Sequence, residues 1–235
     1  MGEDCRIKTS DGEFDAYVAH PQATKAPGLV LIQYISGVNR VMRALADEFA
    51  GLGFVVACPD LFWRQEPNVR INNDPSRQDP AEQKRALQLN AGFDDDTGMA
   101  DLTATLRFLR ADSECTGKVG ALGYCLGGRL AYLMATRTDI DCAVGYYGVN
   151  IQKYLSEADR IARPLLLHVA EQDELCPVDV REQIVSRLRS LPSVTVEVHG
   201  GVRHAFALAG GANYDERAAS AANQRSSAFL KAHLA

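Results

Sequence analysis

Hydrophobic positions along the chain follow two different periods. Near-continuous apolar runs of strand length predict buried β-strands at residues 27–35, 54–58, 118–122, 142–148, 164–169 and 194–198. Between them, apolar residues recur at helical spacing and predict helices at about 41–52, 80–90, 96–109, 129–135, 177–191 and from about 214. Strands that alternate with helices form a mostly parallel, doubly wound sheet covered on both faces. The pattern therefore predicts an α/β protein with three α/β/α layers.

Two segments depart from this alternation. Residues 5–9 and 13–20 flank Ser-Asp-Gly at positions 10–12, a turn sequence that predicts an antiparallel hairpin at the start of the sheet. Residues 61–80 contain repeated Pro, Asn and Asp and predict a long irregular connection. Loops of this length inside a compact domain are usually functional or disordered. Because this loop carries Trp63, we expect a substrate-side lid rather than a disordered insertion.

Composition narrows the class of protein. The 235 residues are 46% hydrophobic and 23% charged, and we expect one α/β domain over residues 1–235. The net charge of −5 gives no support for binding to nucleic acid or to a membrane surface. The first residues lack the apolar core of a signal peptide, and no run of about 18 apolar residues could span a bilayer. Since the six cysteines form no Cys-x-x-Cys pair, we expect reduced thiols in a cytoplasmic protein.

The sequence Gly-Tyr-Cys-Leu-Gly-Gly at positions 123–128 joins a predicted strand to a predicted helix. A nucleophile flanked by small residues at such a junction is typical of the nucleophile elbow, with Cys125 where serine is usual. Glycine is needed on either side because the strand and the helix converge there. The alternative is a Gly-rich connection that holds a buried, inert cysteine.

A thiol titrates near pH ~8.5 and needs a base to act as a thiolate at neutral pH. His204 follows the last predicted strand in a Gly-rich loop, which makes it the preferred base, with His199 as the alternative. We expect His168, inside an apolar strand, to be a core residue. The orienting acid should lie in the turn after strand 164–169, where Glu171 and Glu174 flank the preferred Asp173. The alternative role for Asp173 is to cap the helix near position 177.

Several short sequences resemble the dienelactone hydrolase family in combination. They are Gly-Ala-Leu-Gly-Tyr-Cys-Leu-Gly-Gly at 120–128, Ala-Val-Gly-Tyr-Tyr-Gly-Val at 143–149, Gly-Val-Asn at 37–39, Cys-Pro-Asp-Leu at 58–61, Gln-Asp at 172–173 and His-Ala-Phe at 204–206. The order of nucleophile, acid and base is also that of the α/β-hydrolase triad. The resemblance implies an α/β-hydrolase fold that acts on lactones and esters without metal or cofactor.

The resemblance also implies a role for each residue at the predicted site. It assigns Cys125 as nucleophile, Asp173 as orienting acid and His204 as base. It further implies an oxyanion hole formed by the backbone N–H groups of Leu126 and Ile35.

Two positions depart from the family's pattern. Tyr34 stands where the best-known members carry a glutamate that engages the resting thiol, and Leu208 stands where they carry an arginine for the substrate carboxylate. A phenol cannot take up a proton as a carboxylate does, so Tyr34 either donates a hydrogen bond near the oxyanion or packs against the lid. Without a guanidinium clamp, a neutral substrate is expected. The predicted pocket is lined by Tyr34, Trp63, Leu87, Phe206 and Leu208.

The sequence therefore predicts a hydrolase that cleaves esters or lactones through a thioester on Cys125. An alternative is hydrolysis of activated phosphoesters by the same thiolate. Another, from a different class, is a non-catalytic binding or thiol-sensing protein with the same fold. The expected partner is a small-molecule ester or lactone, and the expected assembly is a monomer or homodimer.

Overall fold

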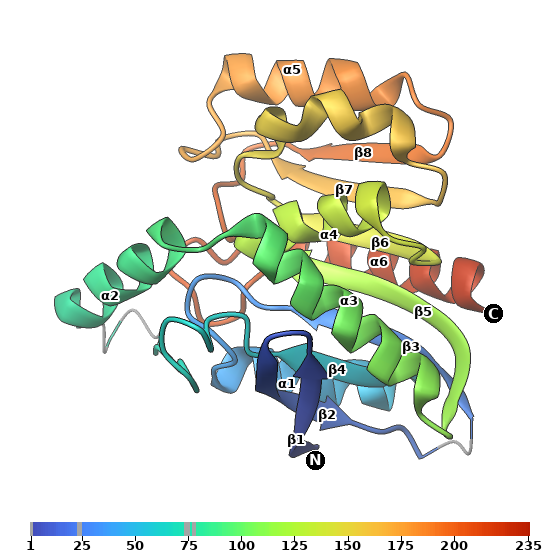
Figure 1. The fold of residues 1–235 in the computed structure, drawn as a ribbon. Helices are drawn as coiled ribbons and strands as arrows, with labels where there is room; N and C mark the ends of the chain where they lie inside the picture. The colour runs from blue at the N-terminus through green and yellow to red at the C-terminus, as the bar shows by residue number, and fades with distance from the viewer. Residues whose placement is uncertain (1, 23–24, 73–75, 77–78) are drawn as a thin grey trace. The chain divides into compact units, whose positions relative to one another are not determined.

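The chain divides into two compact units, Met1–Gly120 and Ala121–Ala235, in a computed structural model that describes residues 2–22, 25–72, 76 and 79–235. The first unit contains β1 (Glu3–Thr9), β2 (Gly12–Ala19), β3 (Ala26–Ile32), α1 (Arg40–Gly51), β4 (Val55–Pro59), α2 (Pro80–Ala91), α3 (Asp95–Ala111) and the start of β5 (Cys115–Tyr124) (Figure 1). The second contains the end of β5, α4 (Leu126–Arg137), β6 (Cys142–Tyr146), the 3-10 helix η2 (Ile151–Arg160), β7 (Leu165–Ala170), α5 (Val178–Arg189), β8 (Val194–His199) and α6 (Glu216–Leu234).

In the first unit the strands lie in the order β1-β2-β4-β3-β5. The hairpin β1–β2 is antiparallel, as its turn sequence predicts, and β2 also pairs antiparallel with β4. β3 and β4 pair in parallel, and every residue of β4 is buried. Helix α1 packs on β2 and β4, while α3 packs on β1, β3 and β4. This half of the sheet is thus mixed in direction.

In the second unit the order is β5-β6-β7-β8, and both β6–β7 and β7–β8 are parallel. Helix α4 covers one face of β6, where its Gly128 lies against Gly145. Helix α6 covers the other face, where the Tyr146 hydroxyl bonds to Ser226. The predicted three-layer α/β/α arrangement, with its parallel strands and antiparallel hairpin, is confirmed.

Two predicted strands end earlier than expected. The run 27–35 leaves the sheet at Ile32 because a turn closes from Tyr34 to Gly37, whose N–H donates to the Tyr34 carbonyl at 3.1 Å. The run 142–148 ends at Tyr146 because Tyr147 takes a positive φ of 37°. Helix η2 was not predicted, although its apolar residues Ile151, Tyr154, Leu155 and Ala158 recur at helical spacing.

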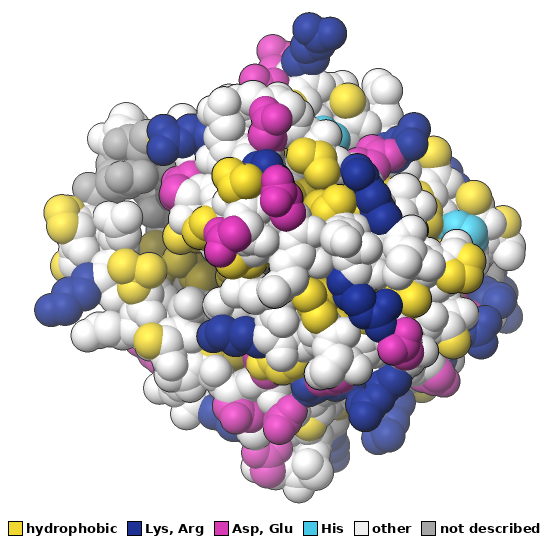
Figure 2. Space-filling model, turned by 90° about the horizontal axis from the view of Figure 1, so that it is seen from above, with side chains coloured by type: hydrophobic (Ala, Val, Ile, Leu, Met, Phe, Trp, Pro, Cys, Tyr) yellow, Lys and Arg dark blue, Asp and Glu magenta, His cyan; other side chains and the backbone are white. Residues whose placement is uncertain are grey.

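Charged side chains of both signs are interspersed on the face drawn in Figure 2. None of the helices in the described part of the chain meets the length and hydropathy that a membrane span needs.

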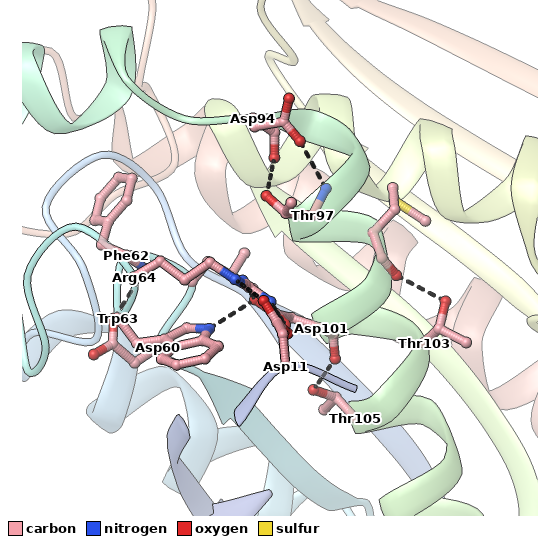
Figure 3. A network of polar contacts seen from close by, with 12 residues as sticks. Asp11, Asp60, Phe62, Trp63, Arg64, Asp94, Thr97, Asp101, Thr103 and Thr105 are labelled. Atoms are coloured by element: carbon pink, nitrogen blue, oxygen red, sulfur yellow. Dashed lines mark hydrogen bonds and ion pairs between the residues drawn. The ribbon is translucent and has the colours of Figure 1, made fainter. Parts of the chain in front are cut away.

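The predicted lid segment, residues 61–80, is fastened to α3 at its start (Figure 3). The Trp63 indole N–H donates to Asp101 at 2.9 Å, and the Arg64 guanidinium binds the same carboxylate at 2.5 and 2.9 Å. Arg64 also makes two 2.8 Å bonds to Asp11 in the hairpin turn. Asp101 is fully buried, so its charge depends on these donors. The lid role itself stays a prediction, and residues 73–75 and 77–78 lie outside the described residues.

Removing the buried carboxylate should destabilise the fold. We expect Asp101→Ala to lower the free energy of unfolding by about 3 kcal/mol, because Arg64 and Trp63 then lose their shared buried acceptor. The matched control is Asp11→Ala, which removes a half-exposed partner of the same arginine and should have a much smaller effect. Urea unfolding followed by circular dichroism measures both. Equal losses would contradict the assignment of Asp101 as the main anchor.

Candidate active site

A sharp strand–turn–helix junction places Cys125 between β5 and α4, as the sequence predicts. Cys125 has φ 56° and ψ −111°, a backbone conformation that costs roughly 1–3 kcal/mol and is concentrated at functional sites. A Cβ at Gly123 would lie 2.0 Å from the Gly127 carbonyl oxygen, and one at Gly128 would lie 2.4 Å from the Tyr146 carbonyl oxygen. Only glycine therefore allows the strand, the helix and β6 to approach so closely.

The Cys125 thiol is nearly buried, with 7% of the residue exposed. Its backbone N–H donates to the Tyr146 carbonyl at 3.0 Å, which ties the turn to the neighbouring strand. Leu126 begins α4, and N–H groups in the first turn of a helix lack an acceptor within the helix.

His204 and Asp173 form a buried pair in the same unit as Cys125. The imidazole Nδ1 lies 2.8 Å from the Asp173 Oδ2, and the two residues are 8% and 5% exposed. The second carboxylate oxygen, Oδ1, accepts the Leu175 N–H at 2.9 Å. The alternative role of Asp173 as a helix cap is wrong, because α5 begins after Pro177 with no side-chain cap. Asp173 instead holds its own turn and the histidine.

The pKa of His204 is determined by its burial and by its hydrogen-bond partners. Burial alone would lower that pKa, but hydrogen bonds with the Asp173 and Cys125 side chains raise it to about 10. The imidazole is therefore protonated at neutral pH and stands beside both an acid and a thiol. Because the folded-state pKa lies above the unfolded value near ~6.5, the stability from this charge is complete below that value and is lost as pH rises toward 10.

Two of the other candidate histidines have a lowered pKa, in contrast to His204. His168 is fully buried as predicted, and burial lowers its pKa to about 3. Burial also lowers the pKa of His199, whose ring nitrogen lies 2.9 Å from His168. His20 pairs with Asp112 in the first unit. His204 differs from these histidines because it pairs with a buried carboxylate in the same unit as Cys125, as a base in a triad requires.

Aromatic rings surround the imidazole of His204. Tyr147 meets it edge-on with ring centroids 5.0 Å apart, and Phe206 meets Tyr147 at 5.5 Å. Sequence reasoning assigned no role to Tyr147, although the Gly-Tyr-Tyr-Gly sequence marks it. Phe206 is fully buried and Leu208 is 5% exposed, so both predicted pocket residues lie in the protein interior near this loop.

The remaining predicted site residues belong to the first unit. Tyr34 is buried, and its hydroxyl accepts a 2.7 Å bond from the Asn39 side chain. Ile35 is half-buried, Trp63 is fixed to Asp101 by its indole N–H, and Leu87 on α2 is 55% exposed. Their roles as oxyanion donor and pocket lining stay predictions.

All six cysteines are free thiols. Burial raises the pKa of Cys176 to about 11 and that of Cys142 to about 12, and it also raises the pKa of Cys58. These thiols stay protonated and are poor nucleophiles at neutral pH.

A doubly wound sheet, a strained cysteine at a strand–helix turn and a buried Asp–His pair define an α/β-hydrolase. The dienelactone hydrolase family matches residues 14–234, and a relative from Azospirillum brasilense is 44% identical over 229 residues that cover 95% of each chain. The carboxymethylenebutenolidase of Pseudomonas putida is 37% identical over 231 residues, which cover 98% of this chain and 96% of that one. The chain belongs to the dienelactone hydrolase family and is a lactone or ester hydrolase.

Solved structures share the fold at lower identity. A chain from Klebsiella pneumoniae subsp. pneumoniae superposes with a TM-score of 0.84 at 23% identity and covers 98% of both chains. A dienelactone hydrolase-like promiscuous phosphotriesterase from metagenomic libraries gives 0.81 at 19% identity and covers 100% of this chain and 99% of its own.

The ionisation of His204 can be measured directly. We expect its imidazole to titrate near pH 10 in NMR spectra of the wild-type protein. Cys125→Ala and Asp173→Asn should each lower that pKa, because each removes a group that stabilises the imidazolium. Cys176→Ala is the matched control, since it removes a buried neutral thiol beside the same acid. A His204 pKa that is unchanged in Cys125→Ala would contradict the contact between thiol and imidazole.

Proposed function

We propose that the chain hydrolyses neutral carboxylic esters or lactones through a triad of Cys125, His204 and Asp173. The single observation that carries the proposal is the 2.8 Å bond from His204 to Asp173, made while the same imidazole contacts the Cys125 thiol. The raised pKa of His204 supports a resting pair of thiolate and imidazolium. The placement of the thiol at the start of α4 supports the same charge state.

In the first half of the reaction, the Cys125 thiolate attacks the acyl carbonyl carbon and the carbonyl oxygen becomes an oxyanion. The backbone N–H groups of Leu126 and Ile35 are the proposed donors to this oxyanion, and each such bond is worth about 3 kcal/mol. As the tetrahedral intermediate collapses, His204 gives its proton to the leaving oxygen. The products are an alcohol, or the opened end of a lactone, and a thioester on Cys125.

In the second half, neutral His204 takes a proton from water, and the resulting hydroxide attacks the thioester. The thiolate of Cys125 leaves, and the carboxylic acid product is released. Asp173 keeps the Nδ1–H of the imidazole pointing away from the thiol and stabilises its positive charge in both halves. Atoms and charges balance in both halves of the reaction without a redox step and without exchange of a metal.

The substrate is proposed to be uncharged near the scissile bond. Leu208 is buried and apolar, where the family resemblance implies an arginine for a carboxylate. Tyr34 holds a hydroxyl group, bonded to Asn39, where a glutamate is implied. A buried leucine offers a substrate carboxylate no partner, so an anionic ligand would lose hydration without compensation.

The nucleophile is tested with p-nitrophenyl acetate. We expect Cys125→Ala to lower kcat by about 10³-fold or more, because the covalent route is lost. Mass spectrometry of the intact wild-type protein, quenched during turnover, should show a mass gain of one acetyl group that is absent in Cys125→Ala. Cys176→Ala is the control and should retain both activity and acylation. Full acylation of Cys125→Ala would contradict the assignment.

Substrate charge is tested with one lactone scaffold that carries either a carboxylate or the matching carboxamide. We expect kcat/KM for the carboxamide to exceed that for the carboxylate by about 10-fold or more, since the chain offers no guanidinium at Leu208. A preference for the carboxylate would contradict the neutral-substrate proposal and leave the triad assignment standing.

Activated phosphoesters are the second candidate substrates. The observation in their favour is the shared fold of the promiscuous phosphotriesterase, which covers this chain completely. The same thiolate would attack phosphorus, expel an aryloxide protonated by His204 and leave a phosphorylated Cys125 for water to cleave. Aryl phosphotriesters assayed beside p-nitrophenyl acetate decide whether that last step turns over, and a stable phosphoryl adduct without turnover would exclude this activity.

A further inference from the structure

A second group of polar side chains lies on the α6 side of β7 and β8, apart from the triad. The Nδ1 of His168 lies 2.9 Å from the Nε2 of His199 and 4.0 Å from a carboxylate oxygen of Glu197. His168 faces Glu197 across the ladder, and His199 follows two residues later on the same face of β8. The ligand atoms of these three side chains all lie within 4.8 Å of one another.

A chain of hydrogen bonds fixes the tautomer of His168. The Tyr146 hydroxyl donates to the carbonyl oxygen of the Asn223 side chain at 2.9 Å. A tyrosine hydroxyl has one proton, and that of Tyr146 is used in this bond. Ser226 must therefore donate the 2.6 Å hydrogen bond between the Tyr146 and Ser226 hydroxyls. The Ser226 oxygen, 3.0 Å from Nε2 of His168, then accepts the Nε2–H of that ring. The Nδ1 of His168 is therefore left with a lone pair directed toward His199 and Glu197.

This arrangement is typical of a metal-ligating histidine. In metal sites the ring nitrogen opposite the ligand atom donates to an oxygen that fixes the tautomer and the ring orientation. Ser226 supplies that oxygen to His168, and Ser226 is itself fully buried and bonded. Two imidazole nitrogens and one carboxylate form a ligand set that suits Zn²⁺ and related divalent transition metals.

We propose that His168, His199 and Glu197 bind a divalent transition metal of the zinc class, with water as the fourth ligand. A tetrahedral Zn²⁺ with bonds of about 2.0–2.1 Å separates its ligand atoms by about 3.4 Å. The two histidine nitrogens must therefore move apart by about 0.5 Å, and the Glu197 oxygen must move closer. His199 and Glu197 are half-buried at the edge of the sheet and can make these shifts, whereas His168 is held in the core.

Arg225 offers a way to change the affinity of this site by mutation. Its guanidinium pairs with the other oxygen of Glu197, and its side chain is 64% exposed. The positive charge of Arg225 competes with a cation for the same carboxylate and repels it. Removing the charge should tighten metal binding, whereas removal of a merely structural ion pair would weaken the site or leave it unchanged.

A bound metal would also strengthen the loop that carries His204. His199 ends β8, and its carbonyl accepts the Glu171 N–H at 3.0 Å in the turn before Asp173. Its ring stacks on Phe206 at 4.9 Å, and Phe206 in turn contacts Tyr147. Fixing His199 to β7 through a metal therefore holds both loops of the triad, and the folded state gains stability from binding.

The test is a titration of the full-length protein with ZnCl₂ by calorimetry, with Co²⁺ absorption as the spectroscopic readout of tetrahedral geometry. All measurements use the Cys125→Ala background, because a triad thiolate could bind zinc by itself. We expect one ion per chain, a raised Tm in zinc and intense tetrahedral Co²⁺ bands. His199→Ala and Glu197→Gln should weaken binding by at least 10-fold, and Arg225→Gln should tighten it several-fold.

His20→Ala is the matched control, since His20 pairs with Asp112 in the other unit and should not affect the affinity. His168 is left unchanged because its substitution could unfold the core. The proposal is overturned if the Cys125→Ala protein binds no zinc. It is equally overturned if His199→Ala binds zinc as tightly as the parent.

Discussion

The close approach of three backbone segments around Cys125 is the constraint on which the second unit depends. The turn between β5 and α4 presses Gly123 against Gly127, while Gly128 lies against the Tyr146 carbonyl of β6. A Cβ at Gly123 or Gly128 would clash with this backbone, so the helix would have to move away from the sheet. Separation would break the bond from the Cys125 N–H to Tyr146 and would turn the thiol away from His204. Strain at one residue is thus maintained by packing at its neighbours.

Local patterns explain which parts of the molecule the sequence predicts. The apolar periods, the Ser-Asp-Gly turn and the Gly-rich elbow each act within a few residues, so the strands, the hairpin and the position of Cys125 follow from them. The order of Cys125, Asp173 and His204 predicts the pair that lies 2.8 Å apart. The pairing of His168 with His199 cannot be read in this way, because 31 residues separate them and only the register of β7 and β8 brings them together. The same holds for the anchoring of Arg64 to Asp101, which joins a loop to a distant helix.

Two buried histidines, His204 and His168, show that the partners of a ring decide its charge. Burial disfavours the protonated ring in both cases. His204 overcomes this with Asp173 and the Cys125 thiol and has a pKa of about 10. Burial, together with the nearby His199 and Arg225, lowers the pKa of His168 to about 3. Two rings of the same unit therefore differ in charge at neutral pH, one protonated and the other neutral.

The hydrogen-bond chain through Tyr146 and Ser226 makes the interior of the second unit depend on helix α6. Helix α6 supplies Ser226 and Asn223, the partners that Tyr146 and His168 need in the protein interior. Tyr146 in turn supplies the carbonyl that holds the Cys125 amide. A nascent chain that has not yet released α6 from the ribosome would have to bury these groups unpaired, at several kcal/mol. The turn that holds Cys125 therefore depends on a helix that lies about a hundred residues further along the chain.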